Sequence, residues 1–129
     1  MNSFIILFNE THMIYLLTDG KIFKINLKDR NSEIIGNIGS KIDLINIMKI
    51  NCQQHKIAVG LLSVPNVQLY DLTMLNESKS PYFVHTGHTL EDIGFSSSVT
   101  GLAWVSEMED EILASSTPNS SLHVWSVSK

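Results

Sequence analysis

Cysteine and charge are both scarce in this sequence of 129 residues. Cys52 is the only cysteine, which excludes an internal disulfide and fits a reducing compartment. Only 17% of the residues are charged, and the formal net charge is −4. The nine lysines and arginines are scattered along the chain and form no basic stripe, so a nucleic-acid partner is not expected.

Long apolar runs are missing as well. The run Phe4–Phe8 is too short for the apolar region of a signal peptide and far too short to span a bilayer. Apolar residues nevertheless make up 43% of the chain, which is too many for a disordered tail. We therefore expect an intracellular protein, in the cytoplasm or the nucleus, with no membrane partner.

Signatures of chemistry are also lacking. The sequence contains no nucleophile elbow, no phosphate-binding loop and no pair of acids in a catalytic pattern. Among its five histidines only His85 and His88 have a spacing typical of metal ligands, and no cysteine or carboxylate supports that pair. We therefore expect no catalytic residue, no cofactor and no metal ion.

What the sequence does contain is a series of short runs rich in Ile, Val, Leu, Tyr and Phe, broken by Gly, Asn, Asp, Ser or Pro. Such runs are typical of β-strands, so the expected fold class is all-β. Lys41–Ile50 could also line a helix, but its short length and its isoleucines favour a strand. The predicted strands are Phe4–Phe8, Ile14–Leu17, Ile22–Leu27, Glu33–Ile38, Leu44–Ile50, Ile57–Leu61, Val67–Asp71, Tyr82–His85, Val99–Trp104, Ile112–Ser115 and Leu122–Val127.

The segment Leu113–Ser126 carries the most specific pattern. It reads as a strand, a tight turn at Pro118–Ser120 and a second strand, and a Gly87-His88 pair precedes it. This order resembles one blade of a WD-repeat β-propeller: a glycine-histidine pair, an apolar strand, a strand with small residues and a strand that ends in an aromatic residue. The resemblance is good from Gly87 to Ser126 and degenerate before it.

The chain also repeats itself. Shifted by 55 residues, the C-terminal part lies over the middle part without a gap, so that Ile112 falls on Ile57 and Trp125 on Tyr70. Intervals of this length match the blade period of a propeller.

When the N-terminal part is shifted by about 44 residues, it also lies over the middle part, so that Phe23 falls on Val67. We predict a single domain of propeller-like blades, incomplete or open, and a small β-sandwich is the alternative fold. The predicted blade-like units cover approximately residues 1–40, 41–86 and 87–129.

The resemblance implies a buried, hydrogen-bonded tetrad with a structural role. Its members would be His88, Ser115, Asn119 and Trp125, with Asn119 where the family usually has an aspartate. An asparagine accepts a hydrogen bond from the imidazole N–H, but the bond is weaker without the charge. Ser126 likewise replaces the usual final aspartate. The network is therefore expected to be present but weakened.

Two connections are candidates for contact with a partner. The long connection after the glycine-histidine pair carries the apolar residues Leu90, Ile93 and Phe95, which either pack on a neighbouring blade or anchor a partner. Glu107–Glu111 is an acidic turn that is either a solvated hairpin loop or a docking patch for a basic partner. Trp104 is expected in the core between two blades.

The resemblance and the lack of reaction signatures imply a non-catalytic scaffold for protein–protein interactions, a subunit of a larger intracellular complex. Three units resemble the C-terminal part of a larger propeller, so another chain that completes the propeller is a candidate partner beside other proteins. Two alternatives stay open. One is a truncated propeller fragment without independent function, and the other is an enzyme or small-ligand module on a β scaffold.

Overall fold

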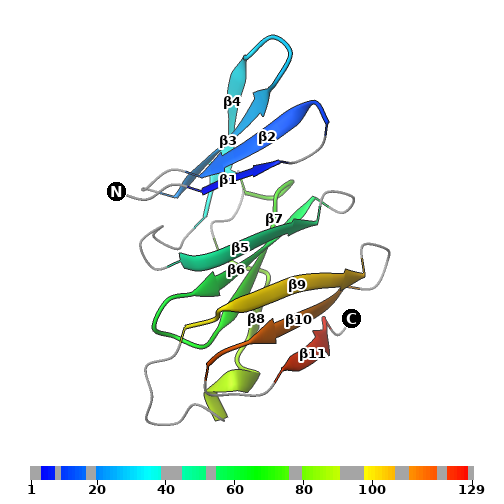
Figure 1. The fold of residues 1–129 in the computed structure, drawn as a ribbon. Coiled ribbons are helices and arrows are strands. Elements are labelled where there is room, and N and C mark those ends of the chain that lie inside the picture. The colour runs from blue at the N-terminus through cyan, green and yellow to red at the C-terminus, as the bar shows by residue number, and fades with distance from the viewer. Residues whose placement is uncertain are drawn as a thin grey trace.

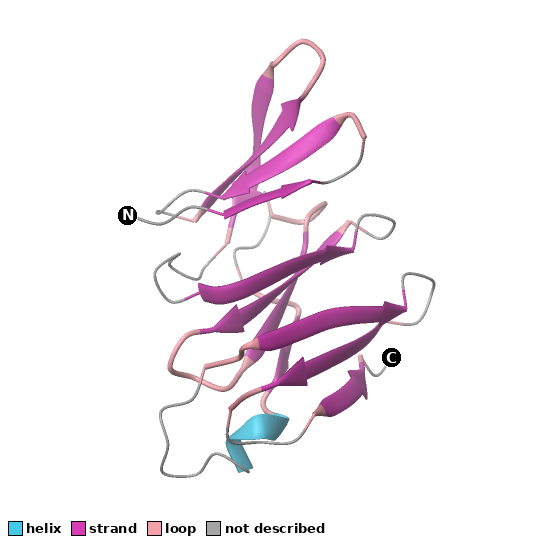
Figure 2. Ribbon diagram, viewed as in Figure 1, coloured by secondary structure: helices cyan, strands magenta, loops and turns pink. Residues whose placement is uncertain are grey.

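The structure is a computed structural model, and it describes residues 4–7, 10–16, 20–38, 45–51, 55–75, 80–90, 98–106, 111–118 and 122–127. Within these residues the chain forms eleven strands in three antiparallel sheets and one short 3₁₀ helix. The all-β fold class is therefore confirmed (Figure 2). In the described segments no helix has the length and apolar character that a bilayer crossing requires.

Within each sheet, every strand pairs with the next one along the chain, so each sheet is a simple meander. The first sheet consists of β1 (Phe4–Leu7), β2 (His12–Leu16), β3 (Lys21–Asn26) and β4 (Ser32–Asn37). The second sheet consists of β5 (Ile45–Asn51), β6 (Lys56–Leu61), β7 (Val67–Asp71) and β8 (Phe83–His85). The third sheet consists of β9 (Gly101–Ser106), β10 (Ile112–Ser116) and β11 (His123–Ser126). The ends of these strands lie within two residues of the predicted ends.

The three sheets are stacked like the blades of a fan (Figure 1). Their first strands, β1, β5 and β9, lie in succession, and β5 contacts both of the others. Each sheet then extends outward from its first strand. A sandwich would have two sheets packed face to face, so the alternative fold is wrong.

Two apolar cores fill the spaces between neighbouring sheets. Each fully buried aliphatic or aromatic side chain contributes about 1.5–3 kcal/mol, so these cores supply most of the stabilising free energy of the stack. The core between the first and second sheets contains Ile14, Ile22, Ile38, Ile45, Met48, Ile57, Val59, Tyr70, Leu72 and Leu75. The core between the second and third sheets contains Ala58, Val67, Leu69, Val99, Leu102 and Leu113.

Trp104 packs against the second core, as expected for a residue between two blades. Its indole Nε1 donates a hydrogen bond to the carbonyl oxygen of Lys49 at 3.2 Å. The ring therefore fixes β9 against β5 through both apolar contact and a polar bond.

The overlay by 55 residues compares the second sheet with the third. It is right for β7 and β11, and it is wrong by one residue for β6 and β10. Trp125 pairs with Leu113 as Tyr70 pairs with Ile57, so the counterpart of Ile57 is Leu113 and not Ile112. The paired residues Leu113 and Trp125 are 12 positions apart in the sequence, whereas Ile57 and Tyr70 are 13 apart, so an ungapped overlay fits only one of the two strands. A displacement of one residue turns a side chain to the opposite face of the sheet.

The 44-residue overlay is wrong by one residue as well. Asn26 and Asp71, which end the third strands of the first two sheets, are 45 residues apart. Each accepts a hydrogen bond at 2.9 Å from a backbone N–H two residues later, that of Lys28 and of Thr73 respectively. Both residues therefore begin the same kind of turn toward the fourth strand.

Candidate functional site

The predicted tetrad lies where the second sheet meets the third. His85 ends β8, the chain turns at Gly87, and the 3₁₀ helix η2 (Gly87–Leu90) then brings His88 beneath β10 and β11 (Figure 1). Gly87 is needed for this approach. A Cβ there would lie 2.9 Å from Nε2 of His85 and 3.1 Å from Nδ1 of His123.

Three of the four predicted tetrad residues are in contact. Nε2 of His88 lies 2.8 Å from Oγ of Ser115, and Nε1 of Trp125 donates to the same oxygen at 2.9 Å. His88 is fully buried and Ser115 is 1% exposed, so these bonds replace water that both groups have lost. The fourth residue, Asn119, lies outside the described residues.

A third histidine joins His85 and His88 at this position. Nδ1 of His123 lies 3.2 Å from Nε2 of His85, and its ring stacks on that of His88 with 3.8 Å between centroids. One ring nitrogen from each of the three histidines lies within 4.8 Å of the others. We call this group the histidine cluster. The sequence did not indicate His123, because the alternation of β11 shows which face a residue occupies but not what lies across the sheet interface.

Aromatic side chains enclose one side of the histidine cluster. The Trp125 ring is nearly parallel to that of His85, with centroids 4.4 Å apart, and it also stacks on Phe83 at 5.6 Å. Trp125 therefore packs on β8 while its N–H reaches Ser115, which combines the apolar and polar uses of an indole.

The pKa of His85 is lowered to about 4. Burial is the main cause, and the nearby His88 and His123 contribute to the same shift. The His85 imidazole is therefore neutral at neutral pH and can accept as well as donate a hydrogen bond.

A second polar group joins the same two sheets, and the sequence did not indicate it. Glu111 pairs with Lys56 at 2.8 Å and accepts a hydrogen bond from the phenol of Tyr82. The ammonium of Lys56 also lies 4.9 Å from the centre of the Tyr82 ring. Burial is the main cause that raises the pKa of Tyr82 well above its usual range, followed by the hydrogen bond to Glu111.

Both interpretations of the acidic turn Glu107–Glu111, a solvated hairpin loop and a docking patch, are wrong for its last residue. Glu111 is only 4% exposed, because its carboxylate turns inward to Lys56 and Tyr82. The rest of that turn lies outside the described residues.

Of the predicted partner-contact residues, Leu90 is the last residue of η2, and Ile93 and Phe95 lie outside the described residues. The described end of this connection is attached to the second sheet. Oγ of Ser98 accepts a hydrogen bond from the backbone of Ser63 at 2.9 Å, and Val99 is fully buried.

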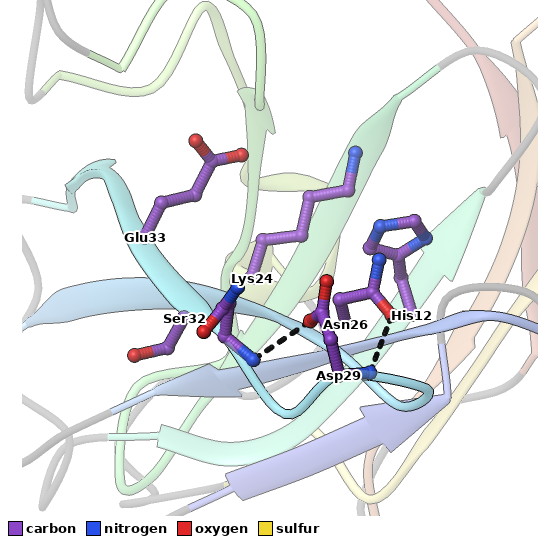
Figure 3. A pocket seen from close by; sticks show the side chains of 7 residues that line it. His12, Lys24, Asn26, Asp29, Ser32 and Glu33 are labelled. Carbon is purple, nitrogen blue, oxygen red and sulfur yellow. Dashed lines mark hydrogen bonds between the residues drawn. The ribbon is translucent and has the colours of Figure 1, made fainter.

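A polar cavity of about 300 Å³ lies on the first sheet beside the turn from β3 to β4 (Figure 3). The hydrogen bonds drawn there belong to the turn itself, such as that from the backbone of Asn31 to Asp29 at 2.9 Å. The side chains of Lys24, Glu33 and His12 rise on the same side of this turn, and the bonds drawn among the lining residues stabilise the turn.

The fold defines the class of structure: three stacked four- or three-stranded meanders are blades of a β-propeller. No protein-family model matches the sequence, and no curated protein is significantly similar to it.

Solved structures do match the fold, and WD40 propellers are among them. The WD40 β-propeller domain of Doa1 matches 94% of this chain with a TM-score of 0.57 and 13% identity. The C-terminal WD40 domain of Sif2 matches 94% with a TM-score of 0.58 and 17% identity. The computationally designed Ika4 protein matches 96% with a TM-score of 0.60 and 13% identity.

The chain spans only part of each of these structures, 36% of the Doa1 chain, 32% of the Sif2 chain and 64% of the Ika4 chain. At such low sequence identity the likeness concerns the fold alone. The resemblance to WD-repeat proteins is thus supported at the level of the blade architecture.

Proposed function

We propose that this chain is a non-catalytic scaffold for protein–protein interactions within an intracellular complex, and that its first and third sheets bind further propeller blades. The blade fold supports the scaffold, since WD40 domains are generally not enzymes and share this architecture. The observation that carries the proposal is that both ends of the stack present an apolar sheet face.

The outward face of the third sheet is free of charge. Ala103, Ala114 and Val124 lie opposite one another across β9, β10 and β11, on the face away from buried Leu113. Val124 is 63% exposed and Val105 is 57% exposed. A contiguous apolar sheet face of this kind marks a surface that binds another protein.

The outward face of the first sheet is apolar as well. Met13 pairs with Ile25, and Phe23 pairs with Ile34, which is 57% exposed. These residues alternate with Ile14, which is buried toward the second sheet, so they face away from it. Each end face thus presents apolar side chains, and the first also carries the exposed Lys21, which lies on the same face of β3 as Phe23 and Ile25.

We assign a second copy of this chain as the occupant. In a stack of blades, the next blade would pack on the outward face of the last sheet. The outward face of the first sheet would in turn pack on the blade before it. Two copies joined head to tail through both pairs of faces would form a ring of about six blades, within the range of roughly four to eight that closed propellers have.

The mass of the purified full chain in solution tests this proposal. We expect light scattering to give twice the 14.4 kDa of one chain. Val124→Asp should shift the protein toward the single-chain mass, because the carboxylate would be desolvated in the interface.

Leu62→Asp is the matched control, since Leu62 is a 40%-exposed apolar residue in the connection from β6 to β7, away from both end faces. It should leave the mass unchanged. A single-chain mass at concentrations of tens of micromolar, or equal effects of the two substitutions, would overturn the assignment of a second copy. Blades from a different chain would then be the remaining occupant.

A further inference from the structure

The histidine cluster has three nitrogen donors at one point of the sheet interface. His85 comes from β8, His88 from η2 and His123 from β11, so three separate elements supply one imidazole each. One ring nitrogen of each lies within 4.8 Å of the other two. The expectation that the chain has no metal site rested on the lack of a third ligand in the sequence, and the fold supplies one.

The spacing of two of these nitrogens already fits a bound ion. Two donors about 2.0–2.1 Å from a tetrahedral Zn²⁺ are about 3.3 Å apart. Nε2 of His85 and Nδ1 of His123 are 3.2 Å apart. One ring nitrogen of His88 lies within 4.8 Å of the other two, and because the His88 ring stacks on that of His123 at an interplanar angle of 11°, one of these two rings must rotate for all three to bind the same ion.

The surroundings orient the rings as outer-shell groups do in known metal sites. Ser115 contacts the Nε2 atom of His88 at 2.8 Å, and Trp125 stacks on His85 with an interplanar angle of 5°. Partners of this kind fix the orientation of a ligating imidazole and raise metal affinity. These contacts hold His85 and His88 at the position of the cluster.

The cluster has access to solvent. Gly87 lies against it, since a Cβ at this position would be 2.9 Å from Nε2 of His85 and 3.1 Å from Nδ1 of His123, so no other side chain occupies the space beside these nitrogens. Both of these histidines are partly exposed, whereas His88 is buried. An ion at this position would have protein ligands on one side and water on the other.

We propose that His85, His88 and His123 form a binding site for a divalent transition-metal ion, with Zn²⁺ as the representative, and that water completes the coordination. Neutral imidazole suits zinc, copper and nickel, whereas magnesium and calcium prefer oxygen ligands. Because the ligands come from two sheets, the ion links the second sheet to the third. The site does not depend on the second copy of the chain.

Calorimetric titration of the metal-free full chain with ZnCl₂ tests the proposal, with MgCl₂ as the second titrant. We expect one Zn²⁺ per chain and no Mg²⁺. His123→Ala and His85→Ala should each lower the zinc affinity by about tenfold or more, since even the loss of an outer-shell partner costs about 10–100-fold. Thermal unfolding should also shift to higher temperature with zinc in the parent protein and not in these two variants.

His55→Asn is the matched control. His55 is exposed, lies outside the cluster and has a φ of 56°, which asparagine tolerates. This variant should bind zinc as the parent protein does. Unchanged zinc affinity in both His85→Ala and His123→Ala, or no zinc binding by the folded parent protein, would overturn the proposal. Circular dichroism of each variant shows that the comparison is made between folded proteins.

Discussion

At the scale of single residues, polar side chains stabilise the junction between the second and third sheets beside the apolar core. The oxygen of Ser115 is shared by the rings of His88 and Trp125. Glu111 is shared in the same way by Lys56 and Tyr82. In each case one group bonds to two larger ones, so a single substitution removes a bond from two partners.

Ser115→Ala should therefore lower the free energy of unfolding by about 2–3 kcal/mol, because it removes one hydrogen bond from buried His88 and one from half-buried Trp125, and a lost bond of a buried group costs about 1–3 kcal/mol. Ser116→Ala is the control on the same strand, since Ser116 lies on the outward face and its loss should cost less than about 0.5 kcal/mol. Urea denaturation at neutral pH measures both. Equal losses for the two variants would contradict a stabilising role for the shared hydroxyl.

Tyr82 predicts a dependence of stability on alkaline pH. Its pKa in the folded protein is raised by burial and by Glu111, and the unfolded phenol titrates near pH 10. The neutral phenol therefore stabilises the fold below about pH 10, and this contribution is lost as the pH rises above that value. The difference in unfolding free energy between the parent protein and Tyr82→Phe should shrink between pH 8 and about pH 11.

Urea denaturation of both proteins across this range provides the measurement. Subtraction of the Tyr82→Phe values removes the titration of lysines that the two proteins share. A difference that stays constant with pH would show that the phenol of Tyr82 ionises as easily in the folded state as in the unfolded one.

At the scale of strands and sheets, the segment that leads into β9 packs tightly against β6 at Gly60. A Cβ at Gly60 would lie 2.7 Å from Cγ1 of Val99 and 2.7 Å from Cγ2 of Ile47. Gly60→Ala should therefore push β9 away from β6 and lower the free energy of unfolding by about 1–3 kcal/mol.

Val99→Ala in the same chain tests whether this contact is the cause. Removing the Val99 methyl groups gives the new Cβ more room, so the double variant should be more stable than the sum of the single effects by about 0.5 kcal/mol or more. The four proteins of this cycle are compared by urea denaturation. Strictly additive losses would place the cost of Gly60→Ala elsewhere, such as in the strand backbone.

The strands themselves were largely predictable from the sequence. Alternating apolar residues and turn residues gave the fold class, and Val67–Asp71 was predicted with the bounds that β7 has. The pairing was less predictable. The spacing of paired residues in β10 and β11 is one residue shorter than in β6 and β7, and the apolar pattern does not show this, so the ungapped overlay placed Ile112 where Leu113 belongs.

The site was predictable only in part, for a related physical reason. The pattern indicated His88, Ser115 and Trp125, and the structure brings these three together. Contacts across a sheet interface depend on how two sheets pack, which one strand's sequence does not specify. His123 in the histidine cluster and Glu111 in the second polar group were missed on that account.

At the scale of the whole molecule, the stack of three sheets buries its two inner interfaces and exposes both of its ends. The outer faces carry exposed apolar residues such as Ile34 on the first sheet and Val124 on the third. In the proposed ring, the first sheet of one copy packs on the third sheet of the other copy. The first sheets of the two copies do not meet, and neither do the third sheets.

Site-directed cross-linking tests that head-to-tail arrangement most directly. The substitutions I34C and V124C are placed in separate chains that also carry Cys52→Ser, and a short bifunctional maleimide suited to sheets about 10 Å apart is added. The account predicts that a mixture of the two proteins yields a covalent dimer, whereas neither protein alone does. Self-linking of either protein, or no dimer from the mixture, would contradict it.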